Sequence, residues 1–153
     1  MPNDYLPISI NIKTAHILIV GGGKVATHKA QLLNRFTDRA KVVSPVVSDE
    51  LRQLPFTIIE RPFQQCDLAG TDILYVCTGD RELNAQIKNM AQTAGVLASV
   101  CDDPELCDFV SPAIARHDRL TIAVGSDATD VKRSIRVRNR IEKLIDEGVL
   151  DIS

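Results

Sequence analysis

The sequence lacks two features that would place the protein in a membrane or on nucleic acid. No apolar run reaches about 18 residues, the shortest length that reads as a membrane-spanning helix, and 18 Lys and Arg residues are balanced by 20 Asp and Glu. The resulting formal net charge of −2 excludes binding to nucleic acid through a generally basic surface. The first residues, Met1 to Tyr5, have neither the basic region nor the apolar stretch of a signal peptide. We therefore expect a cytoplasmic protein without a membrane partner.

Clustered metal ligands are also lacking. The four cysteines form no Cys-x-x-Cys pair, and the three histidines are isolated in the sequence. The sequence therefore predicts no metal site. In a reducing compartment the cysteines are expected to be free thiols, buried or half-buried; they are Cys66, Cys77, Cys101 and Cys107.

What is present is a repeat of apolar runs and helical stretches. The chain has 153 residues and is 44% hydrophobic, enough for a core that needs no disulfide or metal. Two of the runs, Ile17–Val20 and Ile73–Cys77, are continuously apolar, as in strands covered on both faces. The fold class predicted is α/β, an open parallel sheet with helices on both faces. The other expected strands are 40–44, 56–60, 96–101 and 120–124.

Several helix ends can be read from the sequence. Asp80 is placed to cap a helix over 81–94, and Asp103 precedes Pro104 as a second cap. Thr129 or Asp130 begins a last helix that ends at Gly148. The highly charged final helix suggests a boundary near Pro112–Ala115, with one domain over 1–113 and a further region over 114–153.

The strongest motif is the glycine-rich loop that follows the first apolar run. Gly21, Gly22 and Gly23 are followed by Lys24, Val25 and Ala26, which gives Gly-x-Gly-x-x-Ala between a strand and a helix. In this pattern the first glycine turns the chain tightly, and the next lets the backbone approach a pyrophosphate at the helix N-terminus. No Gly-Lys-Ser/Thr follows, which excludes a Walker loop. A dinucleotide site is therefore favoured over a purely structural turn.

The residue that usually recognises the ribose is absent. A carboxylate normally ends the second strand, but here the strand leads into Ser44 and Pro45. Ser44 neither selects nor repels a 2′-phosphate, so charge at this position leaves NAD and NADP both open. Three nearby cations, Arg39, Lys41 and Arg61, are either phosphate contacts or surface charges, and the surface is favoured.

Polar residues follow two later strands, where ligands of open α/β sheets bind. Thr78, Asp80 and Asn84 follow the fourth expected strand, and Asp102 and Asp103 follow the fifth. Because Asp103 is expected to cap a helix, Asp102 is the candidate general base or acid; a turn hydrogen bond is its alternative role. Asn84 either contacts substrate or bonds to the backbone.

These segments together resemble the precorrin-2 dehydrogenase family, the dehydrogenase module of siroheme synthases. The resemblance covers about Leu6 to Val124. It rests on four ordered motifs, which are Leu6-Pro7-Ile8 with Asn11-Ile12, residues 20–29 around the glycine loop, Thr78 to Asn84, and Val100 to Phe109 with Pro112-Ala113.

The resemblance implies a Rossmann domain, a helical dimerisation region and NAD-dependent oxidation of precorrin-2 to sirohydrochlorin. Asp102 matches the family's functional aspartate, Gly21 to Gly23 match its glycine loop, and Thr78 matches its threonine after strand four. Some relatives also insert iron into sirohydrochlorin. For that second activity the candidate groups here are Asp102, His117 and His28. The turn at Gly125–Val131 departs from the family pattern.

The last helix carries six basic residues between Val131 and Lys143 against a single acid, Glu142. The excess is either a solvated helix face or a docking surface for a substrate with many carboxylates, which suits arginine. Nucleic acid is disfavoured because no aromatic residue is interleaved for stacking. The candidate substrate contacts are Asn84, Ser126, Arg133 and Arg136. A regulatory module that binds NAD without catalysis is the competing hypothesis.

Overall fold

The computed structural model describes residues 3–153, which form two compact units. The first unit spans Ile10–Phe109, and the second combines residues 3–9 with Val110–Ser153. The units divide a few residues before the expected boundary at 113/114, because the strand Ala113–His117 belongs wholly to the second unit. Among the described residues, no helix combines the length and apolar character needed to cross a membrane.

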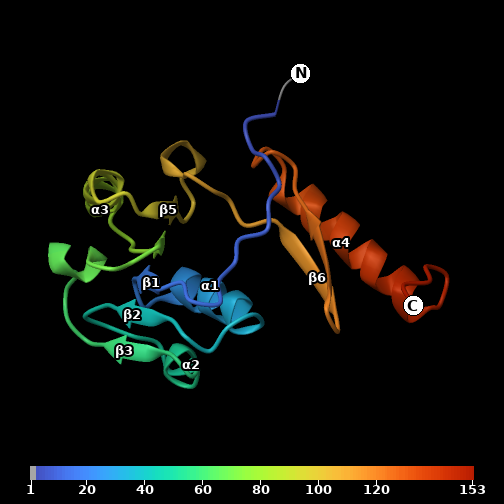
Figure 1. The fold of residues 1–153 in the computed structure, drawn as a ribbon, viewed down its shortest axis with the longest axis horizontal. Coiled ribbons are helices and arrows are strands. Elements are labelled where there is room, and N and C mark those ends of the chain that lie inside the picture. Colours follow the sequence, from blue (N-terminus) through green and yellow to red (C-terminus); the bar gives the residue numbers. More distant parts are fainter. Residues whose placement is uncertain (1–2) are drawn as a thin grey trace. The chain divides into compact units, whose positions relative to one another are not determined.

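The first unit is built on a five-stranded sheet in the order β3-β2-β1-β4-β5, with every neighbouring pair parallel (Figure 1). The topology changes direction between β1 and β4, so a crevice for a ligand is expected at their carboxyl ends. All five strands were predicted, within one or two residues at each end. They are β1 (Ile17–Val20), β2 (Lys41–Val43), β3 (Thr57–Ile59), β4 (Ile73–Val76) and β5 (Leu97–Val100).

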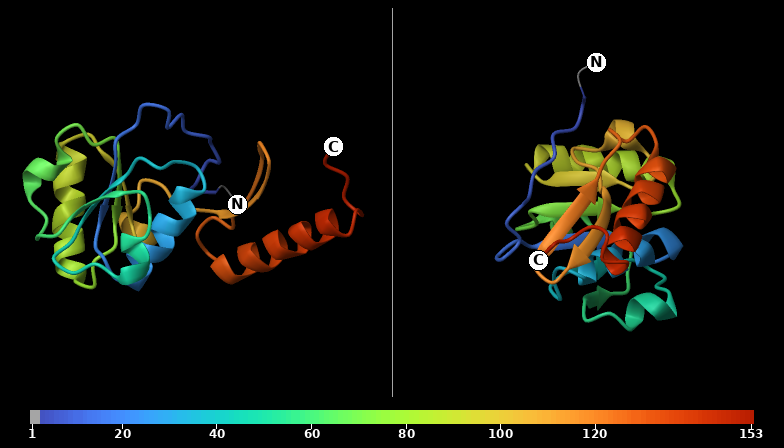
Figure 2. Two further views of the ribbon diagram at one scale, coloured as in Figure 1. Left: turned by 90° about the horizontal axis from the view of Figure 1, so that it is seen from below. Right: turned by 90° about the vertical axis from the view of Figure 1, so that its right-hand side faces the viewer.

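Helices cover both faces of this sheet, as expected for buried parallel strands (Figure 2). Ile17 and Ile19 pack in the cluster that contains Ala26 and Ala30 of one helix. Leu18, on the opposite face of β1, packs in the cluster of a different helix. The helices are α1 (Lys24–Asn34), α2 (Asp49–Arg52) and α3 (Arg81–Thr93), with 3₁₀ turns η1 (Gln65–Leu68) and η2 (Pro104–Leu106).

The predicted cap of α3 is confirmed. The Asp80 carboxylate accepts a hydrogen bond from the Leu83 amide at 3.0 Å, and Gly95 follows the helix with φ +71°. The second cap is only half correct. Asp103 does occupy the position before η2, but its side chain makes no capping hydrogen bond.

The second unit consists of an antiparallel hairpin and one long helix. Strands β6 (Ala113–His117) and β7 (Leu120–Val124) pair with each other, and α4 (Val131–Asp146) packs beside them (Figure 1). β7 was predicted but not its pairing, because β6 has no clear apolar pattern. The cap of α4 is Asp130, whose carboxylate accepts from the Arg133 amide at 2.8 Å.

Candidate dinucleotide-binding site

A cavity of about 880 Å³ opens at the carboxyl ends of β1, β4 and β5, inside the first unit. Its volume is in the range of natural ligand sites. The sequence-predicted residues Gly21 to Val25, Ser44, Pro45, Thr78, Asn84 and Asp102 all line it. The structure therefore brings together residues from four separate segments of the chain.

Gly21 and Gly22 have no room for a side chain. Gly21 has φ +121°, and a Cβ there would lie 2.4 Å from the Cys77 carbonyl oxygen. A Cβ on Gly22 would lie 2.0 Å from the Val46 carbonyl oxygen. These two glycines are required by the packing of the loop itself.

Gly23 differs, because a Cβ there would meet nothing within 4 Å. Gly23 is also the residue before α1, and no side chain caps this helix end among residues 3–153. The first amides of α1 are thus left for a ligand, beside open space that a side chain would fill. Uncapped amides and the positive end of a helix suit a pyrophosphate, so the residues present fit a dinucleotide.

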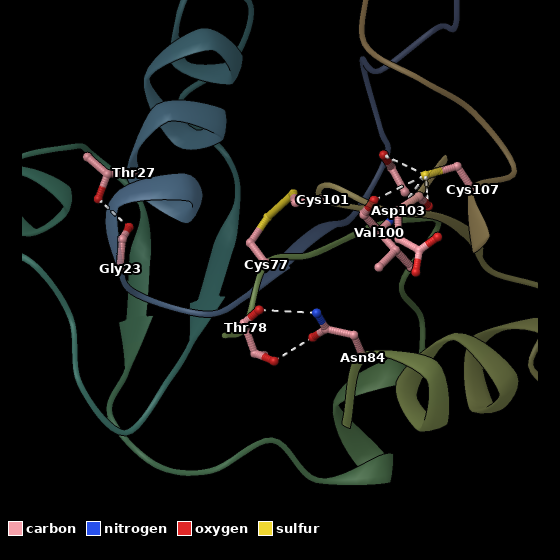
Figure 3. Close-up of a disulfide and its surroundings, with 10 residues drawn as sticks. Gly23, Thr27, Cys77, Thr78, Asn84, Val100, Cys101, Asp103 and Cys107 are labelled. Atoms are coloured by element: carbon pink, nitrogen blue, oxygen red, sulfur yellow. Dashed lines mark hydrogen bonds between the residues drawn. A yellow bond between two sulfur atoms is a disulfide. The ribbon is translucent and has the colours of Figure 1, made fainter. Parts of the chain in front are cut away.

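Two residues that the sequence reasoning missed hold this loop. The Thr27 hydroxyl donates to the Gly23 carbonyl at 2.8 Å (Figure 3) and shares a 2.7 Å hydrogen bond with the Ser48 hydroxyl. The Ser48 amide donates to the Gly22 carbonyl at 2.8 Å. The signal for Ser48 was present, because it precedes Asp49 and Glu50 as a helix cap.

Near the end of β2, Arg39 and Arg61 both make contacts within the protein and are not free to bind a phosphate. The Ser44 hydroxyl donates to the Val46 carbonyl at 2.7 Å, which leaves it able only to accept. Arg61 makes a bidentate pair with Asp67, at 2.8 and 2.6 Å, and Arg39 donates to the Lys13 carbonyl. Arg61 and Arg39 are therefore held by partners within the protein.

Thr78 and Asn84 form hydrogen bonds with each other just beyond the carboxyl end of β4 (Figure 3). The Thr78 hydroxyl donates to the Asn84 side-chain oxygen, and the Asn84 amide donates to the Thr78 carbonyl at 3.1 Å. Asn84 is buried. Asn84 was expected either to contact the substrate or to bond to the backbone, and the structure shows the bond to the backbone.

Two carboxylates from the turn after β5 line the same cavity. Asp102 is exposed and has φ +69°, an uncommon conformation that Asp tolerates better than most residues. The Asp103 carboxylate, 15% exposed, pairs with Arg81 at 3.3 Å. Asp102 was preferred as the general base because Asp103 was expected to cap a helix. Since the Asp103 side chain does not cap η2, this reason no longer holds. The two carboxylates must therefore be compared by experiment.

Lys29 of α1 is a charged neighbour that the sequence reasoning did not single out. Burial lowers the pKa of Lys29, while the charges of Cys107 and Asp102 act in the opposite direction. Lys29 thus places a partly buried amine in the electrostatic environment of Asp102.

The cysteine prediction is wrong for one pair, and it is also wrong about the burial of Cys66, which is exposed. Cys77 and Cys101 form a disulfide between the ends of β4 and β5 (Figure 3), whereas Cys66 and Cys107 are free. Cys107 bonds through its sulfur to Val100 and Asp103. A spacing of 24 residues gives no hint of the pair, which arises because β4 and β5 are adjacent in the sheet.

The other predicted substrate contacts, Ser126, Arg133 and Arg136, lie in the second unit. The Ser126 hydroxyl accepts from Ser134 at 2.9 Å, and this bond ties the turn to α4. Arg138 pairs with Glu142 of α4, and Lys143 pairs with Glu147 just after the helix, whereas four basic side chains are exposed and form no ion pair within residues 3–153. These four are Lys132, Arg133, Arg136 and Arg140. No group of three or more His, Cys, Asp or Glu in the described chain is arranged to hold a metal ion.

The strand order, the glycine turn and the uncapped helix define a Rossmann-type dinucleotide-binding unit. Residues 8–113 match the family described as "Putative NAD(P)-binding", and the chain belongs to that family. Family and fold together support NAD as the cofactor.

Curated relatives extend the similarity over most of the chain. The siroheme synthase of Nitrosomonas europaea is 36% identical over 147 residues, which are 93% of this chain and 31% of the relative. That of Stutzerimonas stutzeri is 37% identical over 141 residues, 88% of this chain and 30% of the relative. The chain thus spans about a third of the length of these relatives.

A solved structure, described as "SirC, precorrin-2 dehydrogenase", is similar with a TM-score of 0.78. The alignment covers 91% of this chain and 70% of that one, at 20% sequence identity. At this identity the similarity shows the fold, and the predicted Rossmann-like architecture is confirmed.

Proposed function

We propose that the protein oxidises precorrin-2 to sirohydrochlorin with NAD as the acceptor. The observation that carries the proposal is the convergence on one cavity of an open glycine turn and a carboxylate at the tip of β5. The names of the relatives and of the similar structure point to the same reaction. NAD, when bound, supplies the acceptor for a hydride from the macrocycle.

Different residues of the protein would bind the cofactor and transfer the proton. The amides at the start of α1 would hold the pyrophosphate, with Gly23 leaving room for it and Lys24 and Val25 beside it. Ser44 and Pro45 would contact the ribose. Thr78, fixed by Asn84, would line the nicotinamide part of the cavity, and Asp102 would accept the proton that the substrate loses with the hydride.

NAD is preferred over NADP in this proposal. A 2′-phosphate near the end of β2 would need a cation, and Arg61 is held by Asp67 in a bidentate pair. Lys41 is exposed at the start of β2, whereas Ser44 follows the other end of that strand.

Substrate recognition is proposed for the four free cations of α4 together with Ser126, because a tetrapyrrole with many carboxylates suits arginine. A homodimer and a cytoplasmic location stay predictions. Iron insertion into sirohydrochlorin also stays a prediction, with Asp102, His28 and His117 as its candidate groups.

The test follows absorbance during incubation of anaerobic precorrin-2 with the protein and NAD⁺, and then with NADP⁺. Equal formation of sirohydrochlorin and NADH supports the proposal, and a clear preference for NAD⁺ supports the cofactor assignment. NADH binding without any product would favour the regulatory module.

Two neighbouring variants test the role of Asp102. Asp102→Asn keeps a residue that tolerates positive φ and removes the carboxylate, so it should bind NADH normally and lose about 100-fold or more in turnover. Asp103→Asn is the matched control and should retain most activity. The reverse result would transfer the role to Asp103.

A further inference from the structure

Cys77 and Cys101 occupy matching places at the ends of neighbouring strands. Val76 and Val100 are paired at the ends of β4 and β5, and a cysteine directly follows each of them. The two Cα atoms lie 5.1 Å apart, within the usual range for a disulfide. The disulfide therefore links two neighbouring strands at matching positions of the sheet register.

Each of these cysteines is joined directly to a part of the cavity. The carbonyl of Cys77 packs against Gly21, and Thr78 follows it. Cys101 is followed by Asp102, with its positive φ. Both cysteines also line the cavity itself. A covalent link between them consequently ties the glycine turn, Thr78 and Asp102 into one rigid edge.

We propose that Cys77 and Cys101 form a reversible redox site that controls how tightly the cavity binds its dinucleotide. This proposal rests on the dinucleotide binding proposed above. The oxidant is a low-molecular-weight disulfide. The two thiols lose two protons and two electrons as their sulfur–sulfur bond forms, and the bond of the oxidant breaks to give two thiols that take up both.

The oxidised form should bind more tightly. In the disulfide-linked structure the cavity is already open and its edge is fixed, so less ordering is needed when a ligand enters. Reduction releases the ends of β4 and β5 from each other, and we expect about threefold weaker binding of NADH. By reciprocity, saturating NADH should make the disulfide harder to reduce.

The experiment measures thiols and binding on the same samples. The protein is equilibrated with mixtures of oxidised and reduced glutathione, free thiols are counted by alkylation and mass, and NADH is titrated by fluorescence. We expect Cys77 and Cys101 to be alkylated together only in the reduced samples, and affinity to follow their state. If Cys77 and Cys101 both stayed alkylatable under full oxidation, the proposal would be overturned, as it would be by equal affinity in both states.

Variants separate this proposal from the proposed function. Cys66→Ser removes an exposed free thiol and should keep the redox response, whereas Cys77→Ser should bind as weakly as the reduced protein under all conditions. If no sample binds NADH while the disulfide still forms, dinucleotide binding itself has failed. If NADH binds with one affinity throughout, only the redox proposal has failed.

Discussion

Thr78 and Asn84 satisfy each other's hydrogen-bonding groups, and in doing so they join the end of β4 to the first turn of α3. The Thr78 hydroxyl also accepts from the Asp80 amide at 3.2 Å, next to the cap of the same helix. The Leu83 amide in turn donates to the Asp80 carboxylate. These hydrogen bonds fix the segment 78–84, which lines the cavity.

Replacing Asn84 should damage both stability and binding. Asn84→Ala removes a buried side chain that accepts from the Thr78 hydroxyl and donates to the Thr78 carbonyl, which costs about 1–3 kcal/mol of unfolding free energy. Urea unfolding measures this loss, and NADH titration should show weaker binding. Asn89→Ala, on an exposed position of α3, is the control and should change neither.

The glycine turn gives a prediction that separates folding from binding. Gly22→Ala would force a Cβ onto the Val46 carbonyl and should destabilise the protein by about 1–3 kcal/mol. Gly23→Ala meets open space and has an ordinary φ of −87°, so its melting temperature should stay near that of the wild type. Its NADH affinity should nevertheless fall at least about tenfold, because the new methyl group takes the space of the pyrophosphate. Unchanged affinity would contradict the assigned phosphate position.

Features that depend on local sequence were predicted well. The five parallel strands, the cap at Asp80 and the glycine turn each follow from adjacent residues with a clear physical preference. The role of Gly22 was missed, because its constraint comes from Val46 across the loop. The disulfide and the β6–β7 hairpin were missed for the same reason, since both depend on which strands become neighbours.

Lys88 and Asp108 form an ion pair in which the lysine is buried. The Lys88 ammonium lies 2.5 Å from the Asp108 carboxylate, which also accepts from the Ala98 amide at 2.9 Å. Burial alone would raise the pKa of Asp108, but Lys88 and the Ala98 amide hold it below its ordinary value. The pair anchors the segment that follows Asp102 to β5 and α3.

Breaking this pair from one side should cost more than replacing both partners. Asp108→Asn leaves the Lys88 charge unpaired, and because Asp108 is partly exposed we expect a loss of about 1–3 kcal/mol. Lys88→Met together with Asp108→Asn should recover part of it. Chemical unfolding of the single and double variants measures the coupling, and strictly additive losses would contradict the pairing.

The Arg61–Asp67 pair predicts how stability depends on pH. Hydrogen bonds from Arg61, and from the Gln64 amide at 2.8 Å, lower the pKa of Asp67 against the opposing effect of burial. Since the folded pKa lies below the unfolded one, the stabilisation is complete above the unfolded value and disappears as pH falls through the folded value. Unfolding free energies of the wild type and Asp67→Asn should therefore differ most near neutral pH, and the difference should shrink as the pH falls below the unfolded pKa of about 3.9. The exposed Asp38→Asn variant should follow the wild type throughout. A gap between wild type and Asp67→Asn that persists undiminished in acid would show that Asp67 stabilises the fold by something other than its charge.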